Sequence, residues 1–177
     1  MKNLGLVLEY YGKKNDVEID FHKDVILIDE GQGTYIDQWN ISDKLPQPSM
    51  EVLEALEPEA MLYYGKQSKL EELKEKFDCA LENSRITSSL GFDVDANTSS
   101  VRNIGALLVI MGSEDVESFC DYNNKMHSLT KKQIETLYVE IIKHIRSLYS
   151  KKWEYRDKIN SLTAQEENNN IVIEFNT

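Results

Sequence analysis

The sequence predicts an α+β protein: an N-terminal antiparallel β-meander, connecting helices, and a small α+β region with a hairpin, a long helix and a short final strand. Three observations predict this class. Short β-branched and aromatic runs separated by turn formers fill the first forty residues, apolar residues recur at helical spacing over 67–84, and a heptad-like repeat occupies 130–163. The expected regions are 1–48, 49–85 and 86–177.

The meander is expected to hold four strands. Glycine, asparagine and aspartate gather between the runs, and these residues favour tight turns. The runs are Leu4–Tyr11, Val17–Phe21, Val25–Ile28 and Thr34–Trp39.

Two helices are expected to follow the meander. The segment Pro46–Pro48 ends regular structure because proline lacks the amide hydrogen. Ser49 is expected to cap a short helix over Met50–Leu56, which Pro58 ends or restarts. Over 67–84 the apolar residues share one face and leave Glu and Lys in solvent, so a second helix is predicted.

The third region is predicted to open with an extended segment over 91–95. Hydroxyl residues at 98–100 offer N-caps for a helix that Gly112 stops. Two alternating runs within 116–129 flank the polar pair Asn123–Asn124, which predicts a β-hairpin.

The helix over 130–163 is the strongest structural signal. Thr130 and Gln133 form a capping box, and apolar residues then recur about every 3.5 residues over roughly four heptads, with Lys152 the polar exception. At about 1.5 Å per residue this helix is roughly 50 Å long, more than a compact domain of this size spans. Cover for the stripe is therefore expected from the helix at 67–84 or from another chain, and self-association is predicted.

The C-terminus is predicted as a polar linker over 165–170 and a strand over Ile171–Phe175, which pairs either with the N-terminal sheet or with a partner's edge. Trp39 and Trp153 are interpreted as core residues first and as partner anchors second. The candidate interaction residues are Tyr138, Ile141, Ile145, Leu148, Trp153, Ile171 and Ile173.

Charge and hydropathy limit the partners. The formal net charge is −11, which repels phosphate backbones, so nucleic acid is not expected as a partner. The only basic cluster is small and consists of Lys151, Lys152 and Arg156. The N-terminal apolar run is too short for a signal peptide, and no stretch reaches the length of a membrane span. A protein of the cytoplasm with no membrane partner is expected.

No catalytic, cofactor-binding or metal-binding residues are predicted. The three histidines, His22, His127 and His144, lack the spacing of zinc or hydrolase motifs, and His144 is interpreted as a partly buried helix residue.

The remaining reactive side chains have simple interpretations. Asp93 and Asp95 are expected to be solvated carboxylates, because the further oxygen ligands of a calcium loop are missing. Cys79 and Cys120 are far apart in the sequence, and two buried thiols are favoured over a disulfide.

Two stretches resemble known phage proteins. The segment Ile36–Trp39 followed by Pro46–Leu53 is similar to the start of small phage tail proteins and tail-fibre assembly chaperones, with Ser49 where threonine is common. From about Glu82 to Leu162 the chain resembles a phage-associated domain of unknown function often found C-terminal in such proteins. The resemblance covers most of 36–163 and is carried by motifs such as Gly91–Asp95, Asn103–Ile104, Leu129–Gln133 and Lys152–Trp153.

The resemblance implies a non-enzymatic protein of a phage or prophage tail module. Its first expected role is a tail-fibre assembly factor or chaperone in the bacterial host cytoplasm, whose partner is a tail-fibre or other tail protein. The first alternative is a minor structural component of the virion tail. The second is a small prophage-encoded enzyme, which would require a pocket around Asp93, Asp95 and His127.

Overall fold

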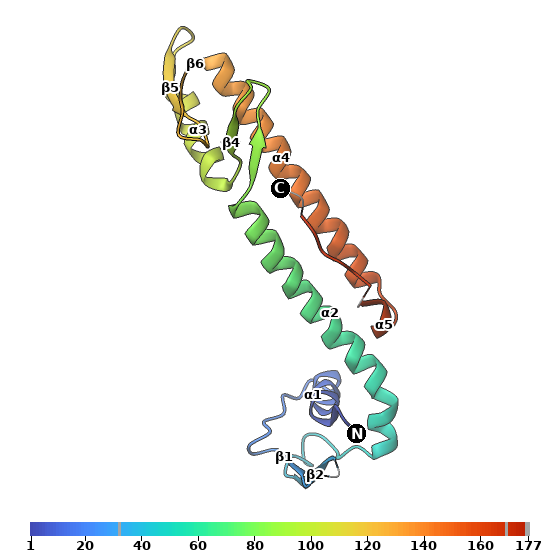
Figure 1. The fold of residues 1–177 in the computed structure, drawn as a ribbon. Helices are drawn as coiled ribbons and strands as arrows, with labels where there is room; N and C mark the ends of the chain where they lie inside the picture. The colour runs from blue at the N-terminus through green and yellow to red at the C-terminus, as the bar shows by residue number, and fades with distance from the viewer. Residues whose placement is uncertain (32, 169, 176–177) are drawn as a thin grey trace. The chain divides into compact units, whose positions relative to one another are not determined.

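The computed structural model describes residues 1–31, 33–168 and 170–175 and confirms the α+β class (Figure 1). By internal contacts the chain divides into two compact units. The first unit is Met1–Lys69 with Ser161–Ile171, and the second is Leu70–Asn160 with the described residues from Val172 onward. The boundary between Lys69 and Leu70 falls inside a helix, whereas the regions expected from the sequence end at residues 48 and 85.

The first element is a helix, α1 (Leu4–Lys14), so the prediction of a strand at Leu4–Tyr11 is wrong. Leu4, Val7 and Leu8 lie at helical spacing and are almost completely buried, and this shared face explains the helix. The segment Val17–Phe21 is no strand either. Its Ile19 is buried in the same core, where it packs without pairing in a sheet.

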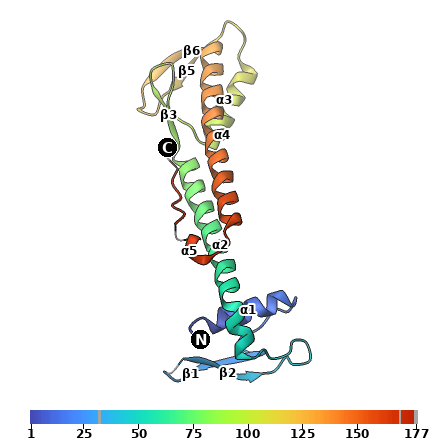
Figure 2. The same cartoon turned by 90° about the vertical axis from the view of Figure 1, so that its right-hand side faces the viewer.

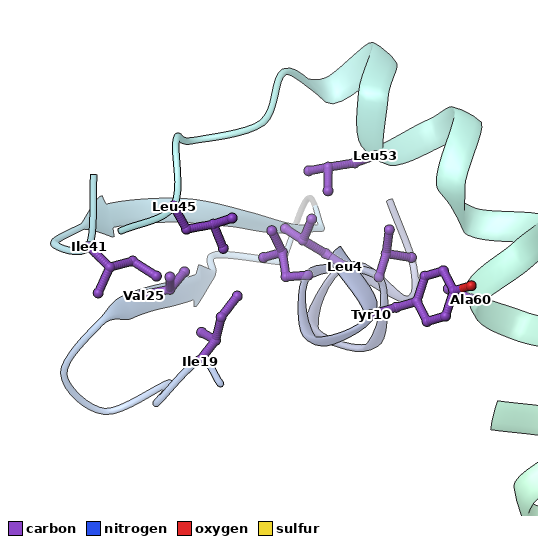
Figure 3. Packing of buried hydrophobic residues seen from close by; sticks show 10 residues of the cluster. Leu4, Tyr10, Ile19, Val25, Ile41, Leu45, Leu53 and Ala60 are labelled. Atoms are coloured by element: carbon purple, nitrogen blue, oxygen red, sulfur yellow. The ribbon is translucent and has the colours of Figure 1, made fainter. Parts of the chain in front are cut away.

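Two of the four predicted strands are confirmed. β1 (Val25–Asp29) pairs antiparallel with β2 (Thr34–Trp39), from Val25 opposite Trp39 to Asp29 opposite Thr34. The expected meander is therefore a single hairpin in the described residues. Figure 3 shows side chains from α1, the hairpin, the loop after it and the next helix converging on one core. The residues labelled there are Leu4, Tyr10, Ile19, Val25, Ile41, Leu45, Leu53 and Ala60.

A single helix, α2 (Met50–Glu82), replaces the two helices predicted here. Ser49 caps it as expected, because its Oγ accepts a hydrogen bond from the Val52 amide at 3.3 Å. The expectation that Pro58 ends the helix is wrong. A proline inside a helix costs about 3 kcal/mol. Leu53 and Ala60 lie on either side of Pro58 and are fully buried, so packing offsets that cost.

Besides the end of α2, the second unit contains two further hairpins and the helices α3 and α4. β3 (Arg85–Thr87) pairs with β4 (Asp93–Asp95), and β5 (Val116–Cys120) pairs with β6 (Met126–Thr130), both antiparallel. The predicted hairpin is confirmed, whereas the extended segment predicted over 91–95 is confirmed only at Asp93–Asp95, because the chain bends at Gly91 and Phe92. α3 (Thr98–Ile110) lies between them, and its N-cap is Asn97, whose side chain accepts from the Ser100 amide.

The long C-terminal helix is confirmed as α4 (Lys131–Ser161). Its capping box is present: the Thr130 amide donates to Gln133 Oε1 at 2.9 Å, and the Gln133 amide donates to Thr130 Oγ1 at 3.4 Å. Part of the expected linker is a short helix, α5 (Gln165–Asn168). None of the described helices is long and apolar enough to cross a membrane.

The segment Ile171–Phe175 belongs to none of the three sheets formed by the described residues, so it is no paired strand. Within the second unit, the part from Val172 to Phe175 runs along α2 and α4 (Figures 1 and 2). We call these four residues the tail.

Candidate interaction surface

Polar side chains fasten α4 to the segment that carries β3. The Ser84 hydroxyl and His144 Nε2 lie 2.6 Å apart, and the Ser88 hydroxyl donates to Glu140 at 2.6 Å. Burial lowers the pKa of His144. Burial raises the pKa of Glu140, but hydrogen bonds from Ser88 and Ser89 outweigh it, so the net pKa is lowered. Ser84 is only 1% exposed, so its hydroxyl is out of reach of a substrate, and the pair is structural.

A second polar cluster closes the β5–β6 hairpin. The Asp121 carboxylate accepts hydrogen bonds from the Asn123 amide at 2.8 Å, the Lys125 amide at 2.9 Å and His127 Nε2 at 2.8 Å. The His127 hydrogen bond is the largest cause that lowers the pKa of Asp121. The His127 ring also stacks on Phe92 at 4.0 Å between centroids. These bonds shape the turn that the sequence placed at Asn123–Asn124.

Asp95 lines a cavity of about 150 Å³ together with Phe119 and Tyr122 among others, and neither Asp93 nor His127 is among the described residues that line it. Asp93 accepts a hydrogen bond from Thr87 Oγ1 at 2.6 Å. In the described part of the chain, no three His, Cys, Asp or Glu side chains gather so as to hold a metal ion.

Larger cavities lie in the first unit. One of about 410 Å³ lies between α1 and the segment after it and is lined by Glu9, Lys13 and Phe21 among others. Another of about 520 Å³ is lined by residues from Glu57 to Leu62 and from Thr163 to Gln165. Both linings combine apolar and charged side chains, and the described residues that line them include no serine, cysteine or histidine.

The predicted stripe of α4 is buried within the chain over much of its length. Ile141 and Leu148 are almost completely buried, as is Ile173 in the tail, while Tyr138, Ile145 and Ile171 are half-buried. α2 supplies part of the cover, because the Phe77 and Tyr149 rings lie 4.9 Å apart. The helix at 67–84 therefore supplies part of the cover that the sequence assigned either to that helix or to another chain. Self-association stays a prediction.

Trp153 lies at the surface. Its side chain is 51% exposed and its ring lies 6.0 Å from that of Tyr149, so the core interpretation of this tryptophan is wrong. Cys79 and Cys120 are also exposed free thiols, so their expected burial is wrong as well. Trp39 is half-buried, and its indole N–H donates to the Leu45 carbonyl at 2.9 Å.

The most exposed apolar side chains of the second unit lie on α3. Val109 is 85% exposed and Ile110 is 77% exposed, and Ala106, one turn earlier, is exposed too. We call these three residues the α3 face. The opposite side of α3 packs into the core through Ile104, with Met111 following the helix.

Sequence reasoning missed the α3 face. It predicted the helix and its end at Gly112 but singled out neither Val109 nor Ile110. The available signal was the run Gly105–Met111, which contains no polar residue. A helical segment that is apolar all round is usually covered on every side, and this second half of α3 is not covered on the side of Val109 and Ile110 within the chain.

Comparison with known families supports a phage-related protein. Residues 18–64 match the XkdW protein family, which is phage-associated. Residues 65–173 match a domain of unknown function, DUF4376. No curated protein and no solved structure matches the chain significantly. The resemblance found in the sequence is thereby confirmed at the level of a phage-related protein. Because the second match covers more than half of the chain, the protein belongs to the DUF4376 family.

Proposed function

We propose that this protein is an assembly factor or chaperone for a phage or prophage tail fibre, and that it acts by protein–protein contact, not by catalysis. The phage association of the XkdW match supports the setting. Action by protein–protein contact is supported by the α3 face, where Val109 and Ile110 are among the most exposed apolar side chains of the chain.

The size of the α3 face suits a transient contact. Burial of apolar surface contributes about 25 cal/mol per Å², so covering two aliphatic side chains favours binding by a few kcal/mol at most. Stable complexes bury about 800 Å² on each partner, far more than these side chains offer. A chaperone has to release its client once the client has folded or assembled, and a small apolar face permits release. The site of action is then the host cytoplasm.

The first test is co-expression of the full chain with the fibre gene from the same locus. We expect the fibre protein to become soluble, to co-purify with this protein after chemical cross-linking, and to lose it after assembly. Val109→Asp should abolish both the gain in solubility and the co-purification, because a charge would be desolvated in the contact. Asn103→Asp is the matched control, since it places the same side chain at an exposed polar position of the same helix.

Three outcomes separate the possible roles. Solubilisation that fails only with Val109→Asp supports the proposal. Persistence of the complex in intact virions would favour a minor structural component of the tail over a chaperone. If the fibre protein neither binds nor gains solubility, the proposed function is wrong.

A further inference from the structure

The backbone of the tail accepts or donates several hydrogen bonds with side chains of α2 and α4. Lys76 Nζ donates to the Ile173 carbonyl at 3.0 Å, and Lys151 Nζ donates to the Glu174 carbonyl at 3.4 Å. The Tyr155 hydroxyl bonds Glu174 twice: it accepts from the amide at 3.2 Å and donates to the carbonyl at 3.3 Å. Hydrogen bonds to backbone atoms do not depend on which side chain the tail carries, so another extended segment could make them.

Two side chains of the tail supply the specificity. Ile173 is 1% exposed. The Phe175 ring lies between two aromatic rings, 5.7 Å from Phe77 and 5.9 Å from Tyr155. Val172, next to Ile173, is 66% exposed and points to solvent. The contacts therefore select an aliphatic residue two positions before an aromatic one, which is the spacing of side chains on one side of an extended chain.

Three lysines lie among these contacts, although the whole chain carries a formal net charge of −11, and one of them, Lys76, also forms an ion pair with Glu72 at 2.9 Å. Lys76 and Lys151 donate to the tail, and Lys152 Nζ lies 4.0 Å from the centroid of the Phe77 ring. We call Lys76, Phe77, Lys151 and Tyr155 the tail site. Its lysines favour a segment with acidic residues beside the apolar ones, as Glu174 is in the tail.

We propose that the tail site is a peptide-binding site for an extended segment of another protein, and that the chain's own tail occupies it until that segment arrives. The segment carries an aliphatic residue two positions before an aromatic residue, with an acidic residue near them. A bound tail reduces the apparent affinity for the incoming segment by the fraction of molecules whose site is open. This inference follows from the contacts of α2, α4 and the tail and is independent of the proposed function.

The test uses the full-length chain and a fluorescent peptide with the sequence of Ile171–Phe175. Ile173→Asp should release the tail, because a carboxylate cannot stay buried there without a partner. We expect the peptide to bind this variant about tenfold more tightly, or better, than the unmodified chain. Val172→Asp is the matched control: it adds the same charge at the exposed neighbouring residue and should bind no better than the unmodified chain.

Two additional measurements keep the test decisive. If Ile173→Asp disturbs folding in circular dichroism, Phe175→Ala provides a milder release of the tail that leaves the tail site intact. Adding Tyr155→Phe to the released variant should weaken peptide binding, because the hydroxyl that bonds the Glu174 backbone is lost. Equal binding to the unmodified chain, Val172→Asp and the released variants, or no binding to any of them, would overturn the proposal.

Discussion

Ile141 offers a direct measure of how firmly α4 is packed into the second unit. Its side chain is fully buried and belongs to the core that also holds Ile104, Ile134 and Leu137. Ile141→Ala removes three carbon atoms, which at about 0.8 kcal/mol each amounts to roughly 2.4 kcal/mol of lost transfer free energy. A cavity term adds to this, so we expect a loss in the free energy of unfolding of about 2–5 kcal/mol.

The assay is urea unfolding followed by the fluorescence of Trp153 in a Trp39→Phe background, which reports on the second unit. With a slope of about 1–3 kcal/mol per M urea, the midpoint should fall by roughly 1 M or more. Val139→Ala is the control, because Val139 lies on the same helix and is 48% exposed, and it should shift the stability by less than about 0.5 kcal/mol. Equal midpoints for the two variants would refute the packing assigned to α4.

Two further predictions concern pH and the first helix. Because burial lowers the pKa of His144 in the folded state, the unfolded chain binds more protons below the ordinary value of 6.5. The free energy of unfolding should therefore fall as the pH drops below about 6.5. His144→Gln should reduce this dependence on pH in urea unfolding measured at a series of pH values. An unchanged dependence would count against a neutral, partly buried His144 in the folded state. In α1, Gly12→Ala should destabilise the first unit by about 1–3 kcal/mol, because the added Cβ would meet the Val17 carbonyl oxygen at 2.6 Å. Gly5→Ala, whose Cβ meets nothing closer than 3.7 Å, should instead raise thermal stability slightly, and a reversed order of the two midpoints would contradict the helix.

The residues of the first element fit both a strand and a helix. Leu4, Leu6, Leu8 and Tyr10 alternate as in a strand, while Leu4, Val7 and Leu8 recur as in a helix. Leu6 decides between the two periods, because a strand would bury it with Leu4, yet it is 41% exposed. Neither period dominates so short a run, and only the packing against the rest of the first unit selects the helix.

The long helices were predictable to different degrees. The spacing of α4 predicted an apolar stripe that needs cover, and Ile134 and Ile141, which belong to that stripe, are fully buried. α2 was harder, since Pro58 is a local signal for a break that tertiary packing of Leu53 and Ala60 overrides. Local propensity is a weak guide wherever buried neighbours offset its cost.

An apolar pattern shows that a side chain needs cover, but it does not show which segment provides that cover. Ile173 was expected in a paired strand, and it is instead buried in a tail whose backbone bonds the side chains of Lys76 and Tyr155. On α3 no described segment of the chain covers the apolar side chains of Val109 and Ile110, and both are exposed. These two cases underlie the two proposed contact surfaces, one occupied by the chain's own tail and one uncovered. Peptide binding by a tail-released variant and fibre binding by Val109→Asp therefore test different elements, and either result stands without the other.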